Sequence, residues 1–150
     1  MKVIKRIMFF ALLFTFVFAN ESIAQRRKLY KSQQLLKQET IIASIDSIVN
    51  TYWLDSSLDA KDFFELTNKN INGFLKSVRG NIEIKKICKC YLNKFNVAVN
   101  ENDGKEVIKN GYVYILLNGK NNLDNVYTLM AKAYASEADK VGAEFIISLF

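Results

Sequence analysis

Histidine is absent from the 150-residue chain, and its absence excludes several kinds of active site. Ser-His-Asp and Cys-His catalysis in their usual forms need an imidazole, and so does any histidine-ligated metal site. The six glycines are scattered and form no glycine-rich phosphate loop. No Asp-x-Asp calcium loop occurs, and we interpret the oxygen-rich run 100–104 as the tip of a hairpin. We therefore expect a protein that is not an enzyme and has no metal or cofactor.

Cysteine is scarce: the two cysteines are Cys88 and Cys90, separated only by Lys89. We predict a strand here, in which alternate side chains share a face, so both thiols would point the same way. One interpretation places both in the core, because free cysteine is among the most buried residue types. The alternative is a redox site, with Lys89 lowering a thiol pKa or a strained disulfide joining the pair. Export into an oxidising compartment keeps that alternative open.

Proline is also missing, while lysine, asparagine and isoleucine are abundant. This composition is typical of a protein from an AT-rich bacterial genome. Half of the residues are hydrophobic, which is enough for a core and argues against wholesale disorder. The length fits one domain, and the formal net charge of +6 makes the chain basic.

A secretory signal peptide is predicted at residues 1–24. Basic residues within 1–6 precede an uninterrupted apolar run at 7–19, and the small residues Ser22 and Ala24 occupy the positions that a signal peptidase inspects. The run is shorter than the roughly 20 residues that span a bilayer, so we expect no stable membrane anchor after cleavage. Cleavage between Ala24 and Gln25 would leave residues 25–150 as a single periplasmic or secreted domain.

The predicted mature chain starts with a short basic arm. Clustered positive charge of this kind can contact an anionic surface such as phospholipid, although short basic termini are more often simply solvated. Export argues against nucleic acid, so we expect another protein or a component of the cell envelope as the partner. The residues of this arm are Arg26, Arg27, Lys28 and Lys31.

Two amphipathic helices are predicted next. Apolar residues recur with helical spacing in 33–53 and again in 63–78, where Gly80 would end the second helix. The short turn 55–59 between them predicts an antiparallel helical hairpin. We interpret its aromatic residues as core rather than as the walls of a pocket; they are Trp53, Phe63, Phe64 and Phe74.

The middle of the chain predicts an antiparallel meander. Apolar and polar residues alternate in 81–92 and again in 95–99, as in strands with one solvent-exposed face. Asn102-Asp103-Gly104 and Asn110-Gly111 have the composition of hairpin turns, which would make 105–109 a short edge strand.

The last part of the chain predicts a strand, a helix and a strand. Residues 112–117 are apolar on both alternating faces and end at Asn118-Gly119, and 143–150 is rich in Phe and Ile. Between them, 123–138 has a single apolar helical face, for which Asn122 is the expected cap and Lys140 and Gly142 the expected end. Such a unit most simply forms a right-handed crossover.

These elements predict an α+β fold, with an N-terminal helical hairpin packed on a mostly antiparallel sheet and a C-terminal strand-helix-strand unit. A cone-shaped NTF2-like domain is the alternative, and either fold leaves the function open. We expect a small exported, non-catalytic binding or accessory protein. A thiol-dependent redox protein using Cys88 and Cys90 is one alternative. Association of the basic arm with an anionic surface is the other.

Overall fold

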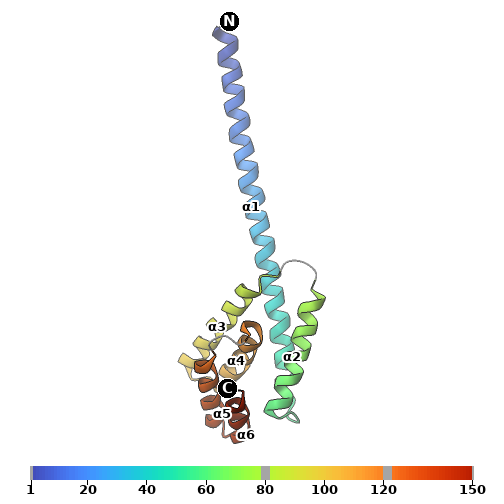
Figure 1. Ribbon diagram of the computed structural model, residues 1–150. Coiled ribbons are helices and arrows are strands. Elements are labelled where there is room, and N and C mark those ends of the chain that lie inside the picture. Colours follow the sequence, from blue (N-terminus) through green and yellow to red (C-terminus); the bar gives the residue numbers. More distant parts are fainter. Residues whose placement is uncertain (1, 79–81, 120–122, 150) are drawn as a thin grey trace. The chain divides into compact units, whose positions relative to one another are not determined.

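The computed structural model describes the backbone of residues 2–78, 82–119 and 123–149, and the side chains from residue 23 onward within these ranges, Leu36 excepted. All the regular secondary structure in these ranges is helical, and none of it is a strand. The predicted α+β fold and its NTF2-like alternative are therefore wrong. The helices of Figure 1 are α1 (Lys2–Trp53), α2 (Ala60–Ser77), α3 (Ile84–Glu101), α4 (Gly104–Asn118), α5 (Asp124–Ser136) and α6 (Lys140–Ser148).

The chain divides into two units, residues 1–40 and 41–150. The first unit is helix from Lys2 onward and is exposed throughout 23–35. The predicted cleavage position between Ala24 and Gln25 lies inside this helix. Where side chains are described, no helix has the length and apolar character needed to cross a membrane. The second unit contains the end of α1 and the helices α2 to α6, and all the pockets discussed below belong to it.

The helical hairpin is one part of the sequence prediction that the second unit retains. The end of α1 and α2 run in opposite directions, joined by the loop 54–59 (Figure 1). Asp59 caps α2, since its side chain accepts a hydrogen bond from the Asp62 amide at 2.8 Å. Gly80, the predicted terminator of α2, lies outside the described residues. The hairpin covers no sheet; its buried side chains face other helices instead.

The core of the second unit is built from apolar side chains that recur every third or fourth residue. This spacing places them on one face of each helix, so that packing of the helices buries them together. α4 contacts α2, α3 and α5, and it is accordingly apolar on most of its circumference. The side chains with the least exposure are Ile45, Ile71, Ile87, Tyr91, Phe95, Ile108, Tyr112, Val113, Met130 and Ile146.

The two strands predicted in 81–92 and 95–99 are wrong, because residues 84–101 form α3. The alternation of apolar residues here coexists with a second pattern, in which Ile87, Tyr91, Phe95 and Ala98 are spaced by four, four and three residues. These four side chains are all buried in the helix, and their burial stabilises the helical arrangement. The local period of two was therefore misleading.

The strands predicted at 105–109 and 112–117 are also wrong, because both segments belong to α4. The turn predicted at Asn102-Asp103-Gly104 does separate two elements, but it connects helices: Asn102 has a left-handed φ of 55° and Asp103 caps α4. Gly111 lies in the middle of α4, where it packs directly against Met130 of α5. Gly119, with φ 70°, ends α4 as the sequence indicated.

The helix predicted at 123–138 is confirmed as α5, although its expected cap, Asn122, lies outside the described residues. Its predicted end at Lys140 and Gly142 is wrong, since α5 stops at Ser136. Residues 140–148 form α6, capped by Asp139, so the strand predicted at 143–150 is wrong over the part that is described. The buried side chain of Ile146 anchors this short helix in the core.

Candidate functional site

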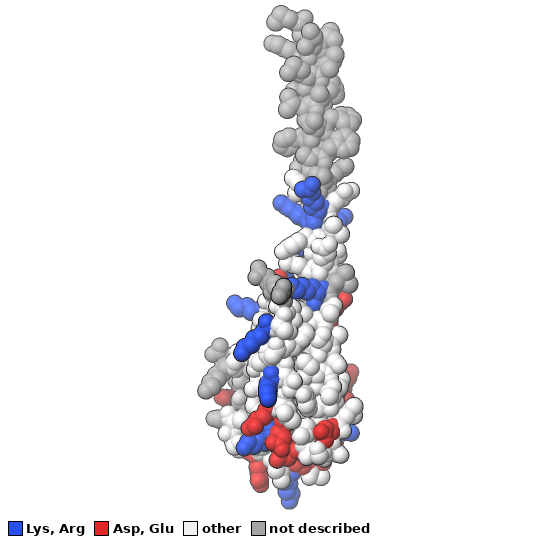
Figure 2. Space-filling view, turned by 90° about the vertical axis from the view of Figure 1, so that its right-hand side faces the viewer, with Lys and Arg blue, Asp and Glu red and all other residues white. Residues whose placement is uncertain are grey.

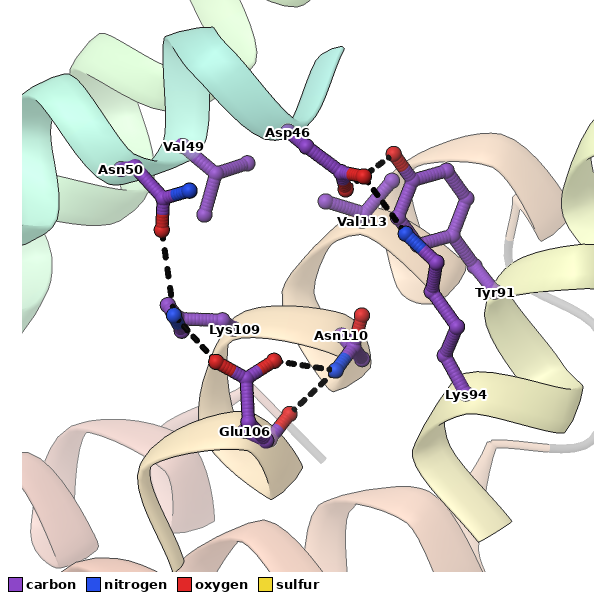
Figure 3. A pocket seen from close by; sticks show the side chains of 9 residues that line it. All are labelled: Asp46, Val49, Asn50, Tyr91, Lys94, Glu106, Lys109, Asn110 and Val113. Carbon is purple, nitrogen blue, oxygen red and sulfur yellow. Dashed lines mark hydrogen bonds and ion pairs between the residues drawn. The ribbon is translucent and has the colours of Figure 1, made fainter. Parts of the chain in front are cut away.

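A polar pocket of about 150 Å³ lies between the end of α1, α3 and α4 (Figure 3). Two carboxylates, two lysines and two amides line it, together with a phenol and two valines. Its residues are Asp46, Val49, Asn50, Tyr91, Lys94, Glu106, Lys109, Asn110 and Val113.

Asp46 is the centre of the first hydrogen-bonded group in this polar pocket. Its carboxylate accepts a hydrogen bond from the Tyr91 hydroxyl at 2.8 Å and forms an ion pair with the Lys94 ammonium at 2.6 Å (Figure 3). The Lys94 ammonium also lies 4.8 Å from the centroid of the Tyr91 ring. Burial raises the pKa of Tyr91 well above its ordinary value, and the charge of Asp46 raises it further. Tyr91 therefore stays neutral and acts as a donor.

Glu106 is the centre of the second group. It forms an ion pair with Lys109, whose ammonium also donates to Asn50 Oδ1 at 3.1 Å. The buried amide of Asn110 donates to the Glu106 carbonyl at 2.8 Å and to its carboxylate at 3.0 Å. These residues approach one another because Glu106, Lys109 and Asn110 are three and four positions apart on α4.

The polar pocket is electrostatically balanced by its own residues. Each of its carboxylates already holds a lysine, so a ligand would have to displace an internal partner. The bonds of Asp46 and Asn50 connect the end of α1, within the second unit, to α3 and α4. We interpret this pocket as structural. Sequence reasoning missed it because its residues come from three segments far apart in the chain.

A second pocket, of about 180 Å³, has a different character. It lies where the end of α1, the loop to α2 and the α5–α6 turn come together. Aromatic and acidic side chains dominate its lining, and we call it the aromatic–acidic pocket. Its residues are Tyr52, Trp53, Asp55, Ser56, Leu58, Asp59, Ala60, Phe63, Tyr134 and Asp139.

The aromatic wall of this pocket is held by ring contacts that continue into the core. Trp53 and Phe63 meet edge to face, with centroids 5.4 Å apart, and Phe63 contacts Tyr112 at the same distance. The hydroxyls of Tyr112 and Tyr134 are 2.9 Å apart. Phe63 is thus a core residue, as predicted, and it also lines the pocket, as does the half-buried Trp53. Trp53 is the one tryptophan of the chain.

Neutral donors hold the three aspartates of the aromatic–acidic pocket. Asp59 and Asp139 cap α2 and α6 by accepting backbone hydrogen bonds of 2.8 Å. Asp55 accepts from the hydroxyl and the amide of Ser57, and these bonds lower its pKa. Within the described ranges, none of the three forms an ion pair with a lysine or arginine. Their negative charge is therefore not neutralised locally.

Figure 2 shows how charge is distributed on one face of the second unit: acidic side chains gather toward its lower end, where basic side chains also lie among them, and further basic side chains lie above. The aspartates of the aromatic–acidic pocket are not arranged to chelate a metal ion. Across the described residues, no group of three or more His, Cys, Asp or Glu side chains could hold one. Carboxylates and aromatic rings at one site can attract an organic cation.

Cys88 and Cys90 lie on α3, so the strand geometry expected for them is wrong. Two residues apart on a helix, they point about 200° apart and cannot form a disulfide with each other. Both are half-buried and neither is in a disulfide. Burial raises the pKa of the Cys88 thiol, so a shift toward the reactive thiolate is not what its surroundings favour.

The four basic residues Arg26, Arg27, Lys28 and Lys31 are exposed on α1 in the first unit. The predicted basic arm is thus part of a helix. The two sets of candidate site residues that the sequence suggested therefore lie in different units: the basic residues are in the first unit and the two cysteines are in the second. Comparison of the chain with protein families, curated proteins and solved structures gives no match.

Proposed function

We propose that the chain is an exported, non-catalytic binding protein that takes a compact organic cation into its aromatic–acidic pocket. The observation that supports this proposal is the lining itself: the aromatic side chains of Trp53, Phe63 and Tyr134, and three aspartates without a basic partner among the described residues. Aromatic faces attract cations, and the attraction strengthens as water is removed.

The size of the pocket limits the ligand. An apolar cavity of roughly 150 Å³ accommodates benzene, so the aromatic–acidic pocket, at about 180 Å³, fits a cation of about six or seven non-hydrogen atoms. Cation–π contacts contribute roughly 0.5–2 kcal/mol each. Two such contacts together with the aspartates correspond to binding of about −4 kcal/mol, a dissociation constant on the order of 1 mM.

The exported and non-catalytic parts of the proposal rest on the sequence. The pattern of residues 1–24 is that of a secretory signal peptide. The chain has no histidine, and the geometry of Cys88 and Cys90 does not favour dithiol chemistry. A component of the cell envelope, or a protein that presents a methylated or primary amine there, is the source of ligand that this proposal expects.

The experiment compares choline with 3,3-dimethyl-1-butanol, a neutral molecule of nearly the same shape. Fluorescence of the full chain is a direct readout because Trp53 lines the pocket and is the one tryptophan. We expect choline to change the emission saturably at constant ionic strength. The neutral molecule should bind at least tenfold more weakly. Equal responses to both molecules, or a choline response that never saturates, would refute the proposal.

Three helix-capping aspartates supply matched variants. Asp59→Asn and Asp139→Asn remove charge from the pocket but keep the cap, because asparagine caps helices about as well as aspartate. Asp103→Asn makes the same change at the cap of α4, outside the pocket. We expect the first two variants to weaken choline binding severalfold and the third to leave it unchanged. Equal weakening in all three would mean that choline senses only the overall charge.

A further inference from the structure

A groove of about 460 Å³ runs between the first turns of α3 and the last turns of α4, apart from both pockets described above. We call it the α3–α4 groove. It combines an apolar floor with two lysines, and it contains one of the two thiols. Its residues are Ile84, Lys85, Cys88, Lys89, Leu92, Tyr114, Leu117 and Asn118.

The two lysines give this groove a positive rim. Lys85 and Lys89 are exposed and four residues apart, so they project from the same side of α3. In the described part of the chain neither forms an ion pair; the neighbouring Glu83 pairs with Lys86 instead. Glu83 is the N-cap residue of α3, and because its charge is paired with Lys86, the charges of Lys85 and Lys89 remain as the net positive charge of the rim.

The floor of the groove is apolar. Ile84, Leu92 and Leu117 line it as half-buried side chains that pack around the core without being enclosed by it. Burial raises the pKa of the half-buried Tyr114, so the phenol adds no negative charge that would oppose an anion. The volume of this groove lies within the range of roughly 300–1,000 Å³ typical of ligand sites, whereas the polar pocket and the aromatic–acidic pocket are both smaller than that range.

We infer that the α3–α4 groove binds a single-chain amphiphile with an anionic head, namely a fatty-acid carboxylate. The carboxylate would contact Lys85 and Lys89, and the alkyl chain would cover Ile84, Leu92 and Leu117. Two simpler ligands fit the groove less well. An anion without an alkyl chain would leave the apolar floor exposed to water, and an alkyl chain without a charge would leave the two lysines of the rim without a partner. A volume in the lower half of the ligand range fits one chain better than the two chains of a phospholipid.

The paired cysteines supply an internal control for the test. Cys88 lines the groove and lies 3.9 Å from Asn118 Oδ1, whereas Cys90, two residues further along the helix, points away from it. The rates at which N-ethylmaleimide modifies each thiol in the full chain can be followed by peptide mass spectrometry, with and without decanoate below its micelle concentration. We expect decanoate to slow modification of Cys88 at least fivefold and to leave Cys90 unchanged.

Charge and site are tested separately. Decyltrimethylammonium has the same chain with the opposite head charge, and it should not protect Cys88. The double variant Lys85→Gln/Lys89→Gln should lose the protection by decanoate, whereas Lys105→Gln, an exposed lysine on α4 outside the groove, should keep it. Equal protection by both detergents, or equal slowing of both thiols, would overturn the inference.

Calorimetric titration of decanoate gives a second measurement that does not depend on thiol reactivity. The wild-type chain should bind decanoate saturably, and the double lysine variant should bind it at least fivefold more weakly. Absence of saturable binding would overturn the inference even if Cys88 proved unreactive. Stronger binding of lysophosphatidylcholine than of decanoate would show that the groove selects a lipid without net charge, and would also contradict it.

Discussion

Replacing Gly111 with alanine tests how closely α4 and α5 approach. In an ordinary helix interior this change stabilises a protein by up to about 1 kcal/mol, because glycine is the more flexible residue in the unfolded chain. At Gly111, however, the new Cβ would lie 2.8 Å from Met130 Cγ and closer still to its sulfur. Met130 is fully buried, so it has no open space to move into.

The sign of the effect follows from these two magnitudes. Overpacking a filled core typically costs about 1–3 kcal/mol. A central cost of about 2 kcal/mol, less the propensity gain of about 1 kcal/mol, leaves a net loss of about 1 kcal/mol. Gly73 is the matched control: it lies in the interior of α2, and a Cβ there would meet no atom within 4 Å. Gly73→Ala should therefore stabilise the protein by about 0.5–1 kcal/mol.

Urea unfolding of the full chain, followed by circular dichroism, measures both variants. A further pair of variants assigns the cause, because in a Met130→Ala background the Cβ has room and Gly111→Ala should become neutral or stabilising. The corresponding coupling free energy should be about 1–3 kcal/mol. If Gly111→Ala stabilises the wild-type chain as much as Gly73→Ala does, then the close packing of α4 on α5 is wrong.

Two other predictions concern backbone strain and buried tyrosines. Ala138 has a φ of 61°, so Ala138→Gly should stabilise the protein by about 1 kcal/mol. Ala135→Gly, within α5, should destabilise it by a similar amount. Urea unfolding measures both variants, and a loss of stability in both would contradict this prediction. Burial raises the pKa of Tyr91, Tyr112 and Tyr134 far above the value of about 10 in the unfolded chain. The contribution of these tyrosines to the free energy of unfolding is therefore fully present below pH 10. Above pH 10 it falls by up to about 1.4 kcal/mol per pH unit for each tyrosine. In an alkaline titration, their tyrosinate absorbance should therefore rise together with loss of helical circular dichroism; ionisation of all seven tyrosines near pH 10 with the helices intact would contradict it.

The sequence alone was informative wherever one residue type satisfies a local requirement. Asp59 begins α2 because its carboxylate accepts a hydrogen bond from a free backbone amide, and Gly119 ends α4 because glycine tolerates a positive φ. The break at Asn102-Asp103-Gly104 was also recognised, although as a hairpin turn rather than a link between helices. Such signals depend on a few neighbouring atoms, so they can be read without knowing the fold.

Sequence patterns also identified three of the helices that have one clear apolar face. The end of α1, α2 and α5 are of this kind, and each was predicted as a helix. α4 was not, because helices on several sides bury most of its surface, and its residues 112–117 are then apolar in every direction. A run of that kind fits a central strand and a buried helix equally well.

Only the tertiary structure decided between helix and strand for α3, α4 and α6, and only it assembled the aromatic–acidic pocket. In α3, the alternating and the helical sets of apolar residues overlap, and the choice depends on which set finds partners to bury it. Trp53 and Asp59 are close in sequence, but Tyr134 and Asp139 join them only because α6 packs beside α2 and α5 packs beside α6. Burial is a property of the whole assembly of helices, and a local pattern cannot specify it.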